Sequence, residues 1–529
     1  MNDRSLELLK ESHGYAVKLR REMDAWLEQS IVMDPVGSFG GGEDEANYAL
    51  GWIHQYLVTR NPKIMDHFAT LKQTFVDWLQ RDGYHGYDPD TDIHHGTEPF
   101  ILFMPRYMGL RPEDTEMAAI LDDAAEHIGN WVPGIPPWYD YDRDGFFTRY
   151  LGTKNARRDP NDAVDIAETL RFIHMTLAAY RAIGTERYLE WSLRYGRKWA
   201  ERLIKAEPPL PIRWGLGEKE IRPHEYLPKK NIRGLPHRGA ANLKFGVHPL
   251  RGVEAMIASG GVYVFGDLYR LSGEEIFKDA ARKIVEPILP RLLDPYNDPG
   301  SAAVHYFRWL FKDDSLDAQI REILAGIPAE PPSKLALVFP EEKKMIGILG
   351  YRWDMAQWGE YSEGGYVKPI QEPSTSALTL AYQMTGNIEY AARALRSAST
   401  KLAMGREVLR GGREHADMGG AICTISSGHG RNWGIGPVTG CYGPLLLGTH
   451  DLMGRVEPML EVRDDAGQTC VPENLLPLVR SDLNAFHEVV FYNGGASPLS
   501  FSWRFTSERG VYSEDAGLAS GEMRRIEIP

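Results

Sequence analysis

The segment Ala182–Ser192, AIGTERYLEWS, reads as a short turn between two helices. Gly184 can end one helix, and Thr185 followed by Glu186 suits the start of the next. Four further segments repeat this pattern: VTRNPKIMDHF (58–68), GLRPEDTEMAA (109–119), LSGEEIFKDAA (271–281) and MTGNIEYAARA (384–394). Each leads into apolar residues spaced three and four apart. The sequence therefore predicts five helical hairpins, over residues 44–81, 98–129, 161–203, 248–292 and 374–404.

The third hairpin illustrates the pattern. Asp159 and Pro160 read as an N-cap and a first helical residue, so a helix is predicted from there onward. One apolar stripe would follow, formed by Val164, Ala167, Leu170, Ile173, Leu177 and Tyr180. The segments between hairpins are long, rich in Pro, Gly, His and Trp, and are predicted to be loops: 82–97, 130–160, 204–247, 293–373 and 405–440. Short turns thus fall on one side of the array and long loops on the other.

Two helical stretches remain, at 4–29 and 441–453, and pairing them would complete a sixth hairpin and close a ring. This arrangement resembles the (α/α)6 toroid of many glycoside hydrolases, polysaccharide lyases and sugar epimerases, although no diagnostic motif accompanies it. An open α-solenoid is the alternative architecture. The predicted fold is therefore all-α dominated, with an (α/α)6 toroid over residues 1–453 and a small β-rich region over 454–529.

Strand-like segments support that last region: LEVRDD, HEVVFYNGG, LSFSWRF and MRRIEIP follow Asp451 and are separated by turn residues. A further short β excursion is predicted within 335–350.

Composition excludes several classes of protein. The 529 residues contain 60 Lys+Arg and 73 Asp+Glu, a formal charge of −13, which argues against a nucleic-acid binder. There is no run of 18 apolar residues and no signal-peptide pattern, so neither a membrane span nor a membrane partner is expected. A cytoplasmic protein is predicted, or an exported one whose leader is not part of this chain. The oligomeric state stays open.

The predicted ligand is an anionic carbohydrate. The long loops enter the first helix of each pair, so helix N-termini near Asp44, Glu98, Asn161, His248 and Ser374 would share one rim, where their dipoles favour anions. Residues 208–247 carry eight Lys/Arg against three Glu, a local charge of +5. With aromatic loop residues suited to sugar rings, this favours a uronic acid. The predicted substrate-binding residues are Asp44, His94, His95, Arg157, Arg158, Arg238, Asn242, Lys244, Trp358, His415, His429, Arg431 and Trp433.

Further histidines and tryptophans of the predicted loops could also face a sugar, among them His85, His305, Trp138, Trp214 and Trp309. Any of these tryptophans can instead pack a loop against the helices.

Carboxylates are the first choice for catalysis. Glycoside hydrolysis needs two of them in different environments, and Glu98 and Glu360 have aromatic and glycine-rich neighbours that could raise the pKa of one. Asp162, beside Asp165 in DPNDAVDIAET, is a further candidate. The alternative is a lyase that cleaves a uronate by β-elimination, with His237 or Tyr361 as the base. An epimerase or isomerase comes third, and a non-catalytic α-solenoid scaffold represents a different class.

One segment suggests a metal. In YDYDRDGFFTRYLG, Asp140, Asp142 and Asp144 precede Gly145 as in the first half of an EF-hand loop, but its twelfth position is Leu151 and not Glu. The pattern allows a structural Ca²⁺ ion or a plain Asp-Gly turn. No other cofactor is predicted to be required.

Overall fold

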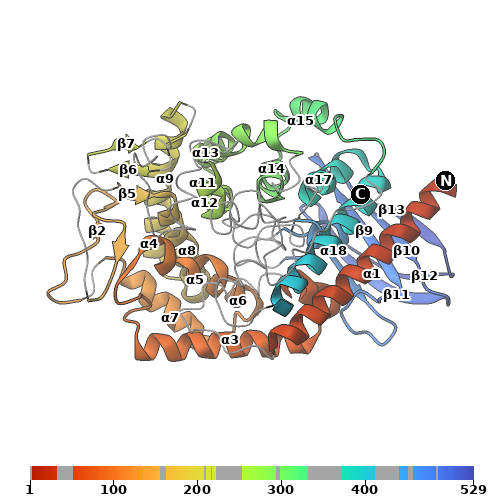
Figure 1. The fold of residues 1–529 in the computed structure, drawn as a ribbon, viewed down its shortest axis with the longest axis horizontal. Coiled ribbons are helices and arrows are strands. Elements are labelled where there is room, and N and C mark those ends of the chain that lie inside the picture. The colour runs from red at the N-terminus through yellow and green to blue at the C-terminus, as the bar shows by residue number, and fades with distance from the viewer. Residues whose placement is uncertain are drawn as a thin grey trace.

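Helices dominate this computed structural model, which describes residues 3–31, 52–129, 132–154, 163–207, 210–211, 213–215, 217–221, 253–293, 298–331, 372–411, 440–450, 457–483 and 486–528 (Figure 1). The labelled α-helices are α1 (Asp3–Ile31), α3 (Pro62–Arg81), α4 (Ile93–Gly96), α5 (Glu98–Leu102), α6 (Met104–Leu110), α7 (Thr115–Glu126), α8 (Arg171–Ile183), α9 (Glu186–Lys205), α11 (Val253–Ala258), α12 (Gly261–Ser272), α13 (Glu275–Val285), α14 (Asp298–Phe311), α15 (Asp317–Leu324), α17 (Thr375–Thr385), α18 (Ile388–Gly411) and α20 (Tyr442–Leu447). Residues 52–59 are also helical, and two 3-10 helices are η1 (Ala167–Leu170) and η3 (Glu286–Arg291).

The strands are short between the helices and longer near the C-terminus. The short ones are β1 (Thr91–Asp92), β2 (Tyr139–Asp140), β3 (Gly145–Phe146), β4 (Tyr150–Leu151), β5 (Ala163–Ile166), β6 (Arg213–Gly215) and β7 (Lys219–Ile221). The C-terminal ones are β8 (Leu460–Arg463), β9 (Leu475–Ser481), β10 (His487–Asn493), β11 (Leu499–Ser507), β12 (Gly510–Leu518) and β13 (Met523–Ile528).

All five predicted hairpin turns are confirmed, and their caps explain them. Gly184, Gly273 and Gly386 end α8, α12 and α17 in the left-handed conformation, with φ of 80°, 72° and 70°. Before α3 and α7 the side chains of Asn61 and Asp114 accept hydrogen bonds from backbone N–H groups of the first helical turn. These signals are local, which is why they can be recognised in the sequence.

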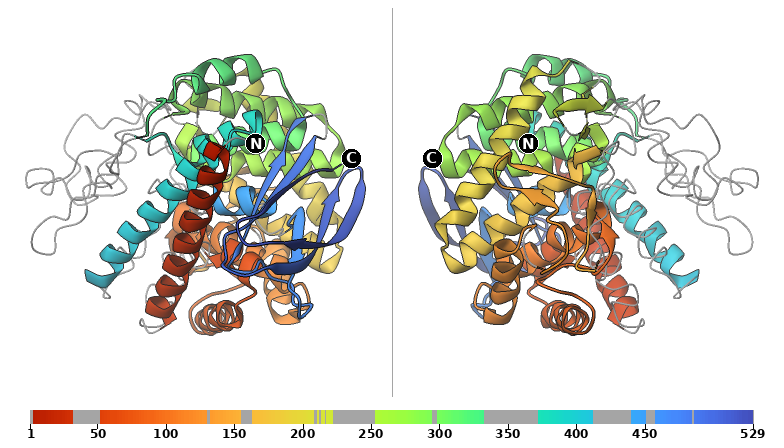
Figure 2. Two further views of the ribbon diagram at one scale, coloured as in Figure 1. Left: turned by 90° about the vertical axis from the view of Figure 1, so that its right-hand side faces the viewer. Right: turned by 90° about the vertical axis from the view of Figure 1, so that its left-hand side faces the viewer.

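The predicted sixth hairpin is wrong. Within the segment predicted as the loop 293–373, α14 and α15 form a further helix–turn–helix unit, joined by two 2.7 Å hydrogen bonds from Arg308 to Asp317. Meanwhile α1 packs along α18, whereas α20 is a short helix whose main neighbour is β9 (Figure 2). Among the described residues α1 is covered by α18, the first hairpin and β9, whereas α20 is covered mainly by β9.

Consecutive hairpins contact one another. Along the chain, α7 packs on α8, α9 on α13, α12 and α13 on α14, and α14 on α17. At the other end of the series α1 contacts α18 and also the first hairpin, where the rings of Trp26 and Trp52 lie 4.7 Å apart and Lys63 forms a 2.6 Å ion pair with Glu28. Thus α1 bridges the last and the first of these hairpins.

The start of the third hairpin also differs from the prediction. Val164 lies in β5, which pairs antiparallel with β6, and the α-helix begins only at Arg171. Asp165 explains the difference, because its carboxylate is engaged by residues distant in sequence, as described below. Tertiary contacts here outweigh a pattern that suits a helix locally.

The C-terminal strands form two three-stranded antiparallel sheets, ordered β13-β10-β9 and β12-β11-β8. Phe491 of β10 meets Phe501 and Trp503 of β11 at 5.1 and 5.8 Å between ring centroids, so the sheets pack face to face. The first sheet also contacts α1, α17 and α20 through β9, and every residue of β10 is buried. In Figure 1 the strands of both sheets lie in the right-hand part of the molecule, beside α1 and α18.

A glutamine joins α17 to the edge of the inner sheet. The Gln383 side chain donates a 2.9 Å hydrogen bond to the Val479 carbonyl and accepts a 2.7 Å bond from the Ser481 N–H. Strands β8, β10, β11 and β13 were predicted, but β9 and β12 were not. Pro477 in β9 argues against a central strand and is tolerated because β9 lies at the edge of its sheet.

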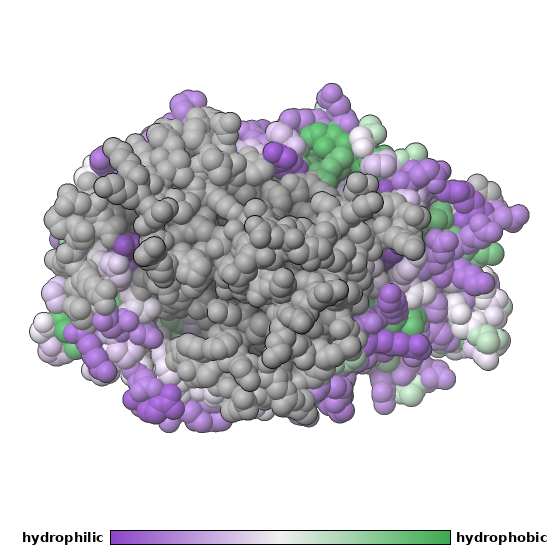
Figure 3. Space-filling model, viewed as in Figure 1, coloured by the Kyte–Doolittle hydropathy of each residue, from purple (hydrophilic) through white to green (hydrophobic). Residues whose placement is uncertain are grey.

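The surface is mostly hydrophilic where the described residues can be seen in Figure 3, with a few apolar areas between them. In the described part of the chain, none of the helices combines the length and the apolar character that a membrane crossing requires.

Candidate functional site

Most of the residues predicted to bind or convert substrate lie outside the described residues. These are Asp44, Arg157, Arg158, Asp162, His237, Arg238, Asn242, Lys244, Trp358, Glu360, Tyr361, His415, His429, Arg431 and Trp433, together with the predicted strands in 335–350. For His94, His95 and Glu98 the structure describes the backbone: the histidines lie in α4, and Glu98 is the first residue of α5. Their roles stay predictions.

The helix N-termini that were expected to share a rim can be compared pair by pair. At the start of α14, the Asp298 carboxylate accepts a 2.9 Å hydrogen bond from the Ser376 N–H in the first turn of α17. Beside it the Ser374 hydroxyl, the N-cap of α17, donates to the Ser301 hydroxyl at 2.9 Å. The first turns of these two helices therefore lie against each other.

A similar contact joins α5 to α8. Arg171, the first residue of α8, is fully buried and donates a 3.4 Å hydrogen bond to the hydroxyl of Thr97, the N-cap of α5. Next along the series, η1 contacts α11, and α11 contacts α14. We call this row of adjacent helix starts, from α5 through α8, α11 and α14 to α17, the rim. Of the helix starts expected to share a rim, those near Glu98 and Ser374 are described, and each lies against the first turn of a neighbouring helix; Asp44, Asn161 and His248 lie outside the described residues.

Three histidines in or near the helices of the rim are buried. Burial lowers the pKa of His174 on α8 to about 4 and that of His305 on α14 to about 3. Burial and the neighbouring His305 also lower the pKa of His450, whose ring lies 4.5 Å from that of His305 and 4.6 Å from that of Trp309. All three are therefore neutral near pH 7. The prediction that His305 and Trp309 belong to a loop is wrong, because both are in α14.

Asp165, which follows the candidate Asp162 closely in the sequence, has a buried carboxylate whose contacts stabilise the fold. Its buried carboxylate accepts hydrogen bonds from the Phe146 N–H at 2.9 Å and the Tyr195 hydroxyl at 3.2 Å. It also forms ion pairs with Arg202 at 2.9 Å and Lys198 at 3.5 Å. Every direction around this carboxylate is thus occupied by groups that join β5 to β3 and α9.

Two of the tryptophans considered as sugar platforms are core residues. Trp138 is fully buried and stacks on Phe146 with ring centroids 5.8 Å apart. Trp214 is buried in β6, with the Arg202 guanidinium 5.0 Å above its ring. Both tryptophans pack loops against helices, which is the alternative role given above for tryptophans of the predicted loops.

The proposed calcium loop is a β2–β3 hairpin whose outer carboxylates have cationic partners. Asp140 is paired with Arg143 at 2.9 Å, and Asp144 with Arg194 of α9 at 2.6 Å. The Asp140 carboxylate also accepts a 3.0 Å hydrogen bond from the Asp142 N–H, as in an Asx turn. A calcium ion would have to displace two arginines, so this geometry favours the plain Asp-Gly turn.

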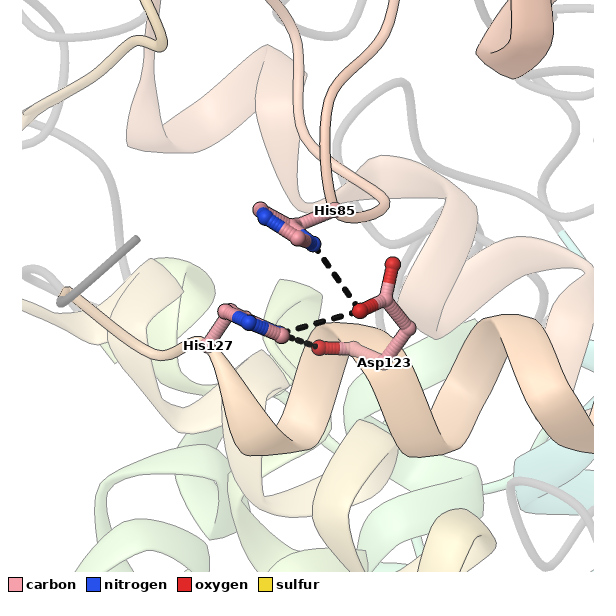
Figure 4. A group of neighbouring side chains, drawn as sticks. All are labelled: His85, Asp123 and His127. Atoms are coloured by element: carbon pink, nitrogen blue, oxygen red, sulfur yellow. Dashed lines mark hydrogen bonds and ion pairs between the residues drawn. The ribbon is translucent and has the colours of Figure 1, made fainter. Parts of the chain in front are cut away.

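A different group brings metal-ligating side chains together. His85, Asp123 and His127 offer ligand atoms that all lie within 4.8 Å of one another, the sole such group among the described residues. The Nδ1 atoms of His85 and His127 lie 2.9 and 3.0 Å from the same atom, Asp123 Oδ1 (Figure 4). The two imidazole rings are stacked, with centroids 3.6 Å apart and planes 10° from parallel.

Local structure positions these three residues. Asp123 and His127 are one helical turn apart at the C-terminal end of α7, where the His127 N–H closes the helix on the Asp123 carbonyl. His85 and Gly86 are the two central residues of a tight turn closed by reciprocal backbone hydrogen bonds between Tyr84 and Tyr87, each 2.9 Å long. Both have positive φ, 50° and 79°, as in a type I′ turn.

Tyr87 connects this turn to the rim. Its hydroxyl donates a 2.6 Å hydrogen bond to the Ala124 carbonyl, which anchors the turn on α7. Its ring lies 5.8 Å from that of Phe100 in α5 and 6.2 Å from that of Phe172 in α8. The group His85–Asp123–His127 therefore lies beside the first turns of α5 and α8.

Sequence reasoning singled out His85 as a loop histidine but missed its partners. The spacing of Asp123 and His127, four residues apart at a helix end, was the available signal. That spacing is common on helices, and nothing in the sequence indicates that a turn 38 residues earlier lies against it.

No protein-family model matches this sequence, and no curated protein shows significant similarity to it. Function must therefore be argued from the chain itself.

Proposed function

We propose that the protein is a glycan-active enzyme, built on an (α/α)6 toroid, that hydrolyses an oligo- or polysaccharide containing uronic acid. Glu98 and Glu360 are the proposed catalytic carboxylates, and the anionic sugar would bind at the rim. The observation that carries the proposal is that the first turns of α5 and α8, and those of α14 and α17, lie against each other, because the dipole of each helix contributes partial positive charge at its N-terminus.

The sequence of helix contacts supports the architecture. From the second hairpin onward, each described hairpin packs on the next, and α1 contacts both ends of the series. The first and second hairpins are joined by the ring contact of Phe68 with Phe103 and by the Lys72–Glu116 ion pair. A toroid requires such a closing contact, whereas an open solenoid keeps its terminal repeats apart.

The surroundings of the rim support an anionic and polar ligand. Arg171 brings a buried guanidinium to the first turn of α8, beside the N-cap of α5, one residue before Glu98. The segments 155–162 and 222–252, which carry three of the four proposed sugar-binding arginines (Arg157, Arg158 and Arg238), directly precede β5 and α11. In β-elimination the enzyme must neutralise the substrate carboxylate, whereas in hydrolysis the same cationic groups would position the uronate.

A panel of uronate-containing glycans tests the proposal. Incubation with the purified protein is followed by reducing-end formation and by absorbance of a C4–C5 double bond. Hydrolysis predicts new reducing ends without that absorbance. Growth of the absorbance would transfer the assignment to a lyase with His237 or Tyr361 as the base, and a changed sugar without new ends would indicate an epimerase.

Variants identify the carboxylates. E98Q and E360Q each remove one charge without changing the size of the side chain, and each is expected to lower kcat by at least about 100-fold. E113Q is the matched control, since Glu113 is an exposed residue in the turn between α6 and α7 and pairs only at 3.4 Å with Arg111. Unchanged activity in E98Q and E360Q would reject these two residues, and no product from any glycan would reject the enzyme class.

A further inference from the structure

We propose that His85, Asp123 and His127 bind a divalent transition-metal ion, with Zn²⁺ as the test ion. The proposed glycan activity does not require this site, and no sequence motif predicts it. The inference rests on the donor set, the spacing of its atoms and the backbone that holds His85 in place.

The donor set suits such an ion. Two imidazole nitrogens and one carboxylate oxygen form the protein part of many three-ligand Zn²⁺ sites, which leave a further position for water. Around a tetrahedral Zn²⁺ ion with bonds of about 2.0–2.1 Å, neighbouring ligand atoms lie roughly 3.3 Å apart. The separations of 2.9 and 3.0 Å from Asp123 Oδ1 to the two Nδ1 atoms are within a few tenths of an ångström of that value.

The stacked rings place both Nδ1 atoms beside the same carboxylate oxygen (Figure 4), and to share one ion the rings must turn so that their in-plane lone pairs converge on it. In the absence of a metal, each Nδ1–H can donate to this oxygen, and the His127 Nδ1 also lies 2.7 Å from the Asp123 carbonyl oxygen. A metal ion replaces these hydrogen bonds when the proton of each ring moves to Nε2. The side chains are 23%, 45% and 26% exposed, so an ion can enter from solvent.

The turn favours a functional role for His85. Type I′ turns prefer Asn, Asp or Gly at both central positions, because most other side chains are strained at positive φ. Gly86 meets this requirement, and a Cβ atom there would lie 2.8 Å from the Ala124 Cβ. His85 adopts φ of 50°, a conformation in which His is enriched together with Asn and Asp. The turn therefore holds the His85 ring against Asp123 and His127, as a ligand position requires.

The charge around the group also favours a cation. Asp122 and Glu126 lie on the same helix end as Asp123, and their carboxylates are held by the Tyr188 hydroxyl and by Arg187, respectively. A bound ion would fasten the turn 84–87 to α7. The chain continues from this turn into α4 and α5, so the ion would also hold in place the segment that leads to the rim.

The experiment uses the full chain after treatment with a chelator. Zn²⁺ binding is measured by competition with a chromophoric chelator in the wild type and in H85N, D123N and H127N. H85N is the most informative variant because Asn is preferred in a type I′ turn, so the fold is kept while the imidazole is removed. Each variant is expected to weaken one Zn²⁺-binding event by at least about tenfold.

Two matched controls account for the other histidines and for charge. D122N removes the same charge as D123N one residue away, and H13Q removes an imidazole on α1 that contacts the Glu473 carbonyl. Both should bind Zn²⁺ as the wild type does. Wild-type binding by H85N, D123N and H127N would overturn the proposal.

A Zn²⁺-soaked crystal provides a second measurement that does not depend on variants. An anomalous peak within bonding distance of the two Nδ1 atoms and Asp123 Oδ1 is expected. No peak at this group, at a Zn²⁺ concentration that saturates the solution titration, would also overturn the proposal.

Discussion

Replacing Asp165 by alanine tests whether the network around this carboxylate holds the third hairpin together. D165A removes the acceptor of the buried Phe146 N–H and one carboxylate partner of Arg202. An unsatisfied buried N–H costs about 1–3 kcal/mol, and breaking a buried ion pair costs about 3–5 kcal/mol in all. Arg202 keeps two 2.7 Å hydrogen bonds to Glu218, so we expect a loss of about 3 kcal/mol in the free energy of unfolding.

Glu218 provides the comparison on the same arginine. Its side chain is 58% exposed, so solvent screens the pair and E218A should cost no more than about 1 kcal/mol. D165N keeps one oxygen for the Phe146 N–H and should fall between the two alanine variants.

Urea unfolding followed by tryptophan fluorescence measures these differences, because the Trp199 and Trp214 rings lie 5.8 and 5.0 Å from the Arg202 guanidinium. Hydrogen exchange of the Phe146 amide reports the same site locally and should accelerate in D165A. Equal losses in D165A and E218A, or unchanged exchange at Phe146, would refute the reasoning.

Three further predictions concern acid stability and one turn. His174 and His305 have pKa values of about 4 and about 3 when folded but 6.5 otherwise, so each contributes stability that is full above pH 6.5 and is lost as pH falls towards its folded value. H305Q should flatten the pH dependence of the unfolding free energy between pH 6 and 4 by up to about 1.4 kcal/mol per pH unit, and an unchanged slope would contradict this. Burial opposes ionisation of Asp313, but hydrogen bonds from Ser315 and the nearby Lys278 and Arg282 outweigh the effect of burial and lower the pKa of Asp313 to about 2. The stability that this carboxylate contributes is therefore lost as pH falls from about 4 to 2. D313N should not show that loss. G86A should lower Tm more than G184A, since both need positive φ but only at Gly86 would the Cβ meet another atom, and equal shifts would argue against a tight contact between the turn and α7.

The hairpins could be predicted because the residues that end and begin their helices act locally. Gly184, Gly273 and Gly386 take the left-handed conformation, and Asn61 and Asp114 cap the next helix with their own side chains. None of these interactions reaches beyond a few residues, so the local sequence is sufficient to predict these turns.

Other elements depend on distant partners and could not be predicted. Val164 continues a helical apolar stripe, yet the pairing of β5 with β6 and the contacts of Asp165 make this segment a strand. The α14–α15 unit begins with Asp298 in a segment rich in Pro and Gly, and its first turn is completed by Ser376 of the α17–α18 hairpin. Composition and apolar spacing alone therefore predict a loop in such a segment.

The candidate site shows the same division. That helix starts would gather at a rim followed from the alternation of short turns and long loops, and the contacts Thr97–Arg171 and Ser301–Ser374 agree with it. The group His85–Asp123–His127 could not be anticipated, because it depends on a turn packing against the end of a helix from the next hairpin.

The glutamine that links α17 to β9 has a consequence for how the chain avoids self-association. An edge strand exposes unpaired peptide groups that can recruit a strand from another molecule. Gln383 occupies two of these groups with its side-chain amide and so takes the place of a neighbouring strand for one residue pair. Any event that separates the sheets from the helices uncovers this edge and a buried apolar face together, so a molecule in that state would be prone to aggregate.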